Sequence, residues 1–243
     1  QGIVEKLYIE VVCHSGKDQA AAIIAGSHTH FVFAERNDEV VLDERQPGGA
    51  DEDDTDIQLS MRMVYDFAMT APLDEISFIL KTKEYNMRAA ELSIKGNYGH
   101  CLGKTMDRPM SHGIFGNSIF SHIISRTASA CDARMGGAMI PVMSNSGSGN
   151  QGICATNPVA VYALENENTE EELIRALMLS HLTAIYIKQS LGKLSALCGC
   201  VVASIGSSCG ITYLMGGDYQ RICNSVKNMV ANLTGMICDG AKP

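Results

Sequence analysis

The stretch "QPGGADEDDTD", Gln46–Asp56, separates two parts of the chain that have different hydrophobic patterns. It holds one Pro, two Gly and five acidic residues, a composition typical of a solvated loop or linker. We therefore expect it to be exposed and mobile. The predicted organisation is a strand-rich piece over residues 1–46, an acidic linker or loop over 47–57, and a helical catalytic-type domain over 58–243.

On the N-terminal side of this stretch, short apolar and β-branched runs alternate with turn residues. The runs that we predict as strands are "LYIEVVC" (7–13), "AAAIIAG" (20–26), "FVFAE" (31–35) and "EVVLD" (39–43). Such a piece would be part of an α/β domain.

On the C-terminal side the pattern is helical. "PLDEISFILKTKEYNMRAAELSIKG" keeps its apolar residues on one face, with Pro72 suited to the first turn and Gly96 to the end. Thr169 and Glu172 form a capping-box pattern before the next long apolar run. The fold class predicted is α+β, a small N-terminal sheet-containing piece followed by a mainly α-helical domain.

The composition restricts the class of protein. The 243 residues are 46% hydrophobic, enough for a sizeable core, and the formal net charge is −8. Nucleic acids and anionic membranes bind basic patches, so neither is an expected partner. Nine cysteines, an odd number, in a chain of this length indicate a reducing cytoplasm, with most thiols packed as small hydrophobes. We see no signal peptide in this sequence.

One uncharged segment, residues 194–217, is long enough to cross a membrane. It lacks an aromatic belt and only about half of it is strongly apolar. A helix buried inside a bundle is therefore the favoured interpretation.

Two short motifs are weak signals for a site. "GHCLGKT" (99–105) is one residue shorter than a phosphate-binding loop and follows a predicted helix instead of a strand, so nucleotide binding is not expected. In "GSHTH" (26–30), His28 and His30 share one side if the strand continues. Two histidines of this kind either belong to a site or are solvated or hydrogen-bonded locally at a turn.

The polar stretch "SNSGSGNQG" (144–152) lies between two apolar segments, "AMIPVM" and "ICATNPVAVYA". Flexible Gly/Ser linkers are normally exposed, so this position is unusual. A polar segment surrounded by core residues has to be satisfied by hydrogen bonds or by a ligand.

The last forty residues predict a helical hairpin. Residues 193–215 form one predicted helix, Gly216 and Gly217 end it, and a second helix runs from Tyr219 to about Ile237. Antiparallel packing brings Cys198 and Cys238 to the same end, whereas Cys200 points elsewhere on an ideal helix. Zinc or iron–sulfur binding needs three or four ligands, so spacing alone does not decide for a metal. Asn224, Asn228 and Asn232 share one face, and either a satisfied core network or a site would explain them.

Several long motifs together resemble the L-serine dehydratase alpha-chain superfamily, in the branch that holds L-cysteine desulfidase. They are "DARMGGAMIPVMSNSGSGNQGI", "LSHLTAIYIKQSLGKLSALCG", "GITYLMGG" and "NMVANLTGMICDGAKP". The resemblance extends over nearly all of the chain.

The resemblance implies a 4Fe–4S cluster held by three cysteines, with one iron open for substrate and no pyridoxal phosphate. The ligand motifs match "ALCG" and "MICDGAK", which assigns Cys198 and Cys238 as metal ligands. The family's third ligand would fall two residues beyond Pro243. Its Cys-Thr-Glu-Pro motif, whose cysteine is the proposed base, has no match here, so the catalytic residue is unknown. The expectation is a middle-to-late part of a longer protein, not catalytically competent by itself.

The same resemblance suggests where the substrate binds. "GSHTH" resembles the Ser-His-Thr signature of the serine dehydratases, which implies substrate contacts for Ser27, His28 and Thr29. The Ser144–Gly152 stretch then reads as a substrate loop, because its glycines permit close approach and its backbone can form an anion nest. The substrate-binding residues predicted in it are Ser144, Asn145, Ser146, Ser148 and Asn150.

The function implied is α,β-elimination of L-cysteine to hydrogen sulfide, ammonia and pyruvate by an iron–sulfur lyase of amino-acid catabolism. L-Serine dehydration is the alternative within the class, and a non-catalytic metal- or thiol-binding relative is the alternative outside it. The expected partner is a small amino-acid substrate, with neither nucleic acid nor membrane. A homo-oligomer is compatible with the sequence, but no feature fixes its order.

Overall fold

The structure is a computed structural model that describes residues 7–26, 30–45, 57–192 and 197–236. The chain divides into two compact units, residues 1–58 and 59–243. The acidic stretch 46–56, which we predict to be an exposed linker, lies outside the described residues.

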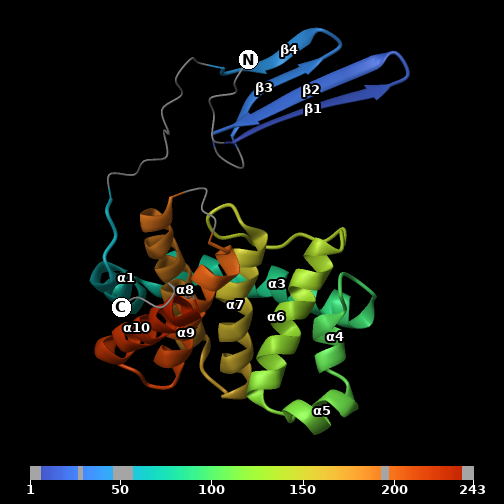
Figure 1. The fold of residues 1–243 in the computed structure, drawn as a ribbon. Helices are drawn as coiled ribbons and strands as arrows, with labels where there is room; N and C mark the ends of the chain where they lie inside the picture. The colour runs from blue at the N-terminus through green and yellow to red at the C-terminus, as the bar shows by residue number, and fades with distance from the viewer. Residues whose placement is uncertain (1–6, 27–29, 46–56, 193–196, 237–243) are drawn as a thin grey trace, which may run out of the picture. The chain divides into compact units, whose positions relative to one another are not determined.

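The described elements follow the order that the sequence predicts, strands first and helices after them (Figure 1). The strands are β1 (Tyr8–Ser15), β2 (Asp18–Ala25), β3 (Phe31–Arg36) and β4 (Glu39–Asp43). The helices are α1 (Met61–Thr70), α2 (Leu73–Ile76), the 3-10 helix η1 (Ser77–Ile79), α3 (Leu80–Lys95), α4 (Leu102–Met106), α5 (Pro109–Phe115), α6 (Ile119–Met135), α7 (Gly149–Glu165), α8 (Glu170–Leu191), α9 (Gly199–Leu214) and α10 (Tyr219–Met236). The α+β class is confirmed.

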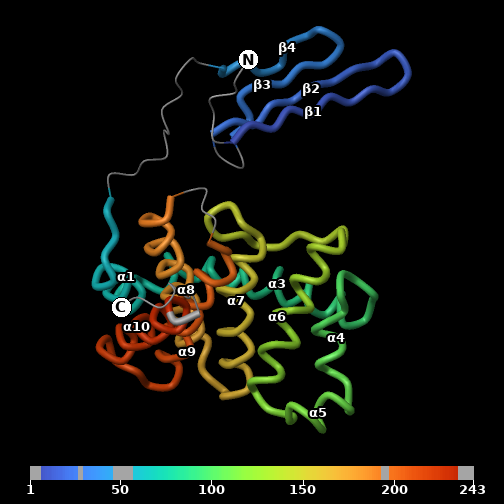
Figure 2. The backbone as a smooth tube through the Cα atoms, viewed as in Figure 1, coloured from blue at the N-terminus to red at the C-terminus, as the bar shows by residue number. Residues whose placement is uncertain are grey.

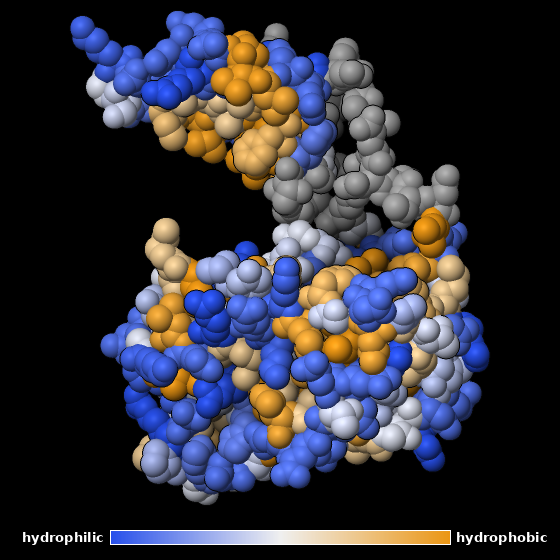
Figure 3. All heavy atoms as spheres, turned by 180° about the vertical axis from the view of Figure 1, so that it is seen from behind, coloured by the Kyte–Doolittle hydropathy of each residue, from blue (hydrophilic) through white to orange (hydrophobic). Residues whose placement is uncertain are grey.

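The strands form an antiparallel meander in the order β1-β2-β3-β4, with neighbours in sequence also neighbours in the sheet. Asn37 and Asp38 join β3 to β4 with φ of 50° and 64°, as tight hairpin turns require. A small apolar cluster packs on the sheet: Ile23, Ala25, Val32 and Phe33. Other apolar residues of this unit are exposed, such as Val41 at 73%. Figure 3 shows apolar residues on the surface of this unit.

The helical unit is built around α7, α8 and α9. Helix α8 packs against both α7 and α9, and α6 packs against α7 and α3. Figure 2 shows α6 and α7 side by side. The largest fully buried side chains include those of Ile153, Leu177, Leu179 and Val202, from the three central helices.

Small residues let α9 approach α8 closely. A Cβ at Gly206 would overlap the carbonyl oxygen of Ser180, and one at Gly210 would lie 2.8 Å from that of Ala176. Most of the uncharged segment 194–217 therefore forms helix α9, which packs inside the bundle, and this explains why the segment is apolar. Within the described part of the chain, no helix is long and apolar enough to cross a membrane.

Two helices differ from those predicted, one by an internal division and one at its start. The helix predicted from Pro72 to Gly96 is divided into α2, η1 and α3, although it begins and ends as expected. Helix α9 begins at Gly199, so the predicted helical start at residue 193 is wrong for Leu197 and Cys198, which precede it. Cys198 is the N-cap, with φ −57° and ψ 130°.

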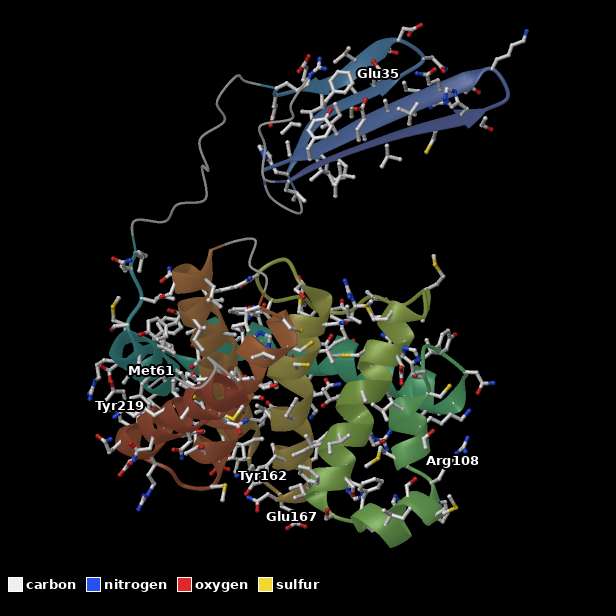
Figure 4. The ribbon with its side chains drawn as sticks, viewed as in Figure 1. Glu35, Met61, Arg108, Tyr162, Glu167 and Tyr219 are labelled. Atoms are coloured by element: carbon white, nitrogen blue, oxygen red, sulfur yellow. The ribbon has the colours of Figure 1, made fainter. Side chains whose placement is uncertain are left out.

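Helix α10 lies at the surface of the bundle. It buries Ile222 against the core, and its first residue, Tyr219, has its ring 5.2 Å from that of Tyr65 in α1. Figure 4 shows Tyr219 beside Met61, where α10 and α1 begin. Asn224, Asn228 and Asn232 are exposed, so the asparagine stripe is a solvated face and not a core network.

Candidate functional site

The Ser144–Gly152 stretch is a tight turn followed by a helix start. Asn145 and Ser148 exchange backbone hydrogen bonds of 3.1 and 3.0 Å across the turn, and Ser146 and Gly147 have φ of 48° and 78°. Ser148 is the N-cap of α7, and its Oγ accepts from the backbone N–H of Gln151 at 3.3 Å. Much of the polarity of the stretch is therefore explained by a turn of primed type and a helix cap.

The five predicted substrate-binding residues of this stretch differ in exposure. Ser144 and Ser146 are exposed, Ser148 and Asn150 are half-buried, and Asn145 is 4% exposed. The side chain of Asn145 is turned into the protein. Its role is therefore to hold the turn in place, while the other four residues remain accessible.

Asn145 begins a buried hydrogen-bond chain through His181 of α8. Gln151 Nε2 donates to Asn145 Oδ1 at 2.7 Å, and Asn145 Nδ2 donates to His181 Nδ1 at 3.1 Å. His181 Nε2 lies 3.0 Å from Thr156 Oγ1, which donates to the carbonyl oxygen of Gly152 at 2.8 Å. These partners assign the neutral tautomer with the proton on Nε2, because Nδ1 accepts and Thr156 has already used its own proton.

Burial lowers the pKa of His181 to about 4. A protonated ring would also turn a donor toward Asn145 Nδ2, so the chain requires the neutral form. The sequence did not single out His181 as a site residue. It is one histidine in the apolar run "LSHLTA", and nothing in this run indicates which side chains it will contact.

The lowered pKa predicts a pH dependence of stability. The unfolded histidine binds a proton below about pH 6.5 and the folded one only below about pH 4, so protons favour unfolding between these values. The free energy of unfolding should fall by up to about 3 kcal/mol as the pH drops through this window. Urea unfolding between pH 4 and 7 should show a flatter profile for His181→Gln than for the wild type. An exposed control, His14→Gln, should keep the wild-type slope; equal slopes for all three proteins would contradict the prediction.

A close backbone approach fixes the start of α7 against the preceding segment. A Cβ at Gly152 would overlap the carbonyl oxygen of Met143 and lie 2.8 Å from two backbone atoms of Ser144. Asn86 of α3 binds the same segment, since its Oδ1 accepts from the N–H of Met143 at 2.8 Å. The turn is thus held from α3, α7 and α8 together.

The starts of α7 and α9 meet beside this turn. A Cβ at Gly199, the first residue of α9, would lie 2.8 Å from Gln151 Oε1 and 3.5 Å from Ser148 Oγ. Cys198, just before it, is exposed. The predicted metal ligand Cys198 therefore stands next to the predicted substrate stretch, where two helix N-termini provide positive potential.

Three further thiols come together behind Cys198. Cys131 of α6, Cys154 of α7 and Cys200 of α9 pack in one cluster. Hydrogen bonds from Cys131 and then Cys154 lower the pKa of Cys200, and Cys198 and the charge of Arg134 act in the same direction. The expectation that Cys200 points away from Cys198 is wrong, because the helix begins between them and the helical rotation does not apply.

Other predicted site residues lie outside the described part of the chain. These are Ser27, His28, Thr29 and the second predicted metal ligand, Cys238. His30, next to the first group, is exposed and lies 3.8 Å from a carboxylate oxygen of Glu44. Over residues 7–26, 30–45, 57–192 and 197–236, no group of three or more His, Cys, Asp or Glu side chains is arranged to hold a metal ion.

In the segment that resembles a phosphate loop, residues 99–105, a carboxylate of α6 binds the backbone N–H groups. The Asp132 carboxylate accepts from the backbone N–H groups of His100 at 2.9 Å and Gly103 at 3.4 Å. These are the donors that a phosphate would need. Asp132 thus satisfies two N–H groups of this segment, whose later residues belong to α4.

Comparison with known proteins places the chain among bacterial relatives. A family model described as the serine dehydratase alpha chain matches residues 14–243. A UPF0597 protein of Bacteroides fragilis is 65% identical over the whole chain, and one of Bacteroides thetaiotaomicron is 64% identical; the chain covers 57% of each. A UPF0597 protein of Porphyromonas gingivalis is 49% identical, again over the whole chain and 58% of the relative. The chain thus spans little more than half the length of these relatives, and no solved structure matches it.

Proposed function

Since the chain belongs to the serine dehydratase alpha-chain family, we propose that it is part of a lyase that removes the β-substituent of a small L-amino acid, with L-cysteine as substrate. We propose this activity for the protein at its full natural length, because the chain spans only 57% of the length of its Bacteroides fragilis relative. L-Cysteine and water would give pyruvate, ammonia and hydrogen sulfide.

The observation that carries the proposal is the position of Cys198. Its thiol is exposed, at the N-terminus of α9, and Gly199 beside it contacts the Ser144–Gly152 stretch. A soft thiolate in positive potential suits an anionic iron–sulfur cluster. Cys198 thus suits one ligand position of a 4Fe–4S cluster that Cys238, outside the described residues, would help to hold, and when bound the cluster would supply a Lewis-acidic iron.

The chain's own residues would bind and orient the amino acid. Ser144 and Ser146 are exposed, and Asn150 is half-buried at the first turn of α7. The Ser146 hydroxyl donates to Asn145 Oδ1 at 3.0 Å, so it would meet the substrate as an acceptor. Asn145, held by His181 and Gln151, keeps the turn rigid so that these groups stay in place. Ser27, His28 and Thr29 are proposed as further substrate contacts. The base that takes the Cα proton is not assigned to a described residue.

L-Serine is the second candidate substrate, because the matching family model is described by serine dehydratase. The chemistry differs only in the leaving group, hydroxide instead of hydrosulfide. A turn that binds the amino-acid backbone does not by itself distinguish the two.

The test is anaerobic reconstitution of the full-length protein with iron and sulfide. We expect a brown protein that releases pyruvate and sulfide from L-cysteine faster than it releases pyruvate from L-serine. Iron uptake without turnover of either amino acid would instead indicate a metal- or thiol-binding relative. Turnover without iron would contradict the proposed cofactor.

A further inference from the structure

Arg134, in the last turn of α6, reaches the place where α7 and α9 begin. Its Nη1 donates to Asn150 Oδ1 at 3.1 Å and to the sulfur of Met135 at 3.2 Å. A Cβ at Gly149 would overlap Arg134 Nε, so the guanidinium lies against the first turn of α7. Gly199, the first residue of α9, packs on the same turn, where a Cβ would lie 2.8 Å from Gln151 Oε1 and 3.5 Å from Ser148 Oγ.

This guanidinium has no acidic partner among the described residues. Arg45, Arg62 and Arg175 each pair with a carboxylate within 3.0 Å, but Arg134 forms no such pair. The nearest acid in sequence, Asp132, is buried and bound to His100 and Gly103. Arg134 is exposed, so its remaining N–H donors are available to an anion.

A buried acceptor at the same place also lacks a partner. Gln151 is 0% exposed, and its Oε1 accepts no hydrogen bond within the described structure. This atom faces Gly199 at the start of α9, and its Nε2 is occupied by Asn145. Buried polar atoms are rarely left unpaired, so the meeting point of α7 and α9 is a place that a ligand with both donor and acceptor groups would complete.

We propose that Arg134, with Asn150 and the first backbone N–H groups of α7 and α9, binds the carboxylate of the amino-acid substrate. A guanidinium binds a carboxylate through two parallel hydrogen bonds, and the helix N-termini favour the same charge. Arg134 lies against the start of α7, and the start of α9 packs on the same turn, so an amino acid held by Arg134 lies near Cys198, the N-cap residue of α9. The identity of the ligand rests on the proposed function.

The test measures binding by calorimetry to the full-length protein before reconstitution, with L-serine and with ethanolamine, which is serine without its carboxylate. We expect ethanolamine to bind at least tenfold more weakly than L-serine. Arg134→Gln should weaken L-serine binding at least tenfold and leave ethanolamine binding unchanged, and Arg134→Lys should restore part of the affinity. The Arg134 Nε–H signal in a ¹⁵N NMR spectrum should shift with L-serine.

Arg126→Gln, on the same helix, is the matched control and should bind L-serine as the wild type does. Wild-type affinity in Arg134→Gln, equal binding of ethanolamine, or no binding of L-serine would each overturn the inference. L-Serine binding that depends on Arg134, in a reconstituted protein that turns over neither amino acid, would overturn the proposed function alone. In an active enzyme, Arg134→Gln should raise KM at least tenfold with iron content unchanged.

Discussion

Replacing Cys198 by Ala in the full-length protein is expected to remove most of the bound iron and to abolish pyruvate release. Cys198 stands exposed at the N-cap of α9, beside the turn that we assign to substrate binding. With one thiolate of three removed, two ligands would remain, too few to hold the cluster and to keep one iron open in a fixed position. Iron content per chain and pyruvate formed from L-cysteine are the two measurements. Cys238→Ala is expected to behave in the same way.

The matched control is Cys209→Ala. Cys209 is 0% exposed in the middle of α9, so its substitution should cost only core packing, about 1 kcal/mol. Cys200 is unsuitable as a control because its thiol interacts with that of Cys198. If Cys198→Ala keeps its iron while Cys209→Ala loses it, the assignment of the ligand is wrong.

Replacing Gly152 by Ala is expected to destabilise the helical unit by about 3 kcal/mol or more. The new methyl group would overlap the carbonyl oxygen of Met143, which is backbone and is held in place by Asn86. The clash cannot be relieved by a side-chain rotation, so the turn or α7 has to shift. The helix propensity of Ala would offset about 1 kcal/mol of the cost. The urea midpoint of the purified protein measures the effect.

Gly113→Ala provides the comparison. Gly113 lies within α5, and a Cβ there would meet no atom within 4 Å. This substitution should therefore leave the stability unchanged or raise it by up to about 1 kcal/mol. If both substitutions leave the urea midpoint unchanged, the packing of Met143 on Gly152 does not constrain the turn. A displaced turn should also lower turnover in Gly152→Ala, because Ser146 and Asn150 would move with it.

The order of strands and helices could be predicted from local patterns. Apolar runs separated by turn residues predicted β1 to β4, and the capping pair Thr169 and Glu172 predicted the start of α8. These signals depend on neighbouring residues only, so no tertiary information is needed to interpret them. The start of α9 was predicted too early, because "LGKLSALCG" contains good helix formers and nothing local stops the helix before Gly199.

For the candidate site, the sequence alone determined that a polar stretch lies between core segments. Through the family resemblance it also implied that Cys198 is a metal ligand. Only the tertiary structure decided which polar groups face inward. Asn145 bonds to His181, 36 positions away, because the packing of α7 and α8 brings them together. Among the described residues, the side-chain oxygen of Gln151 has no donor. The same packing brings Arg134 to the starts of α7 and α9. Hydrophobic periodicity reports which face of a helix is buried, but not which side chain of another helix it meets there.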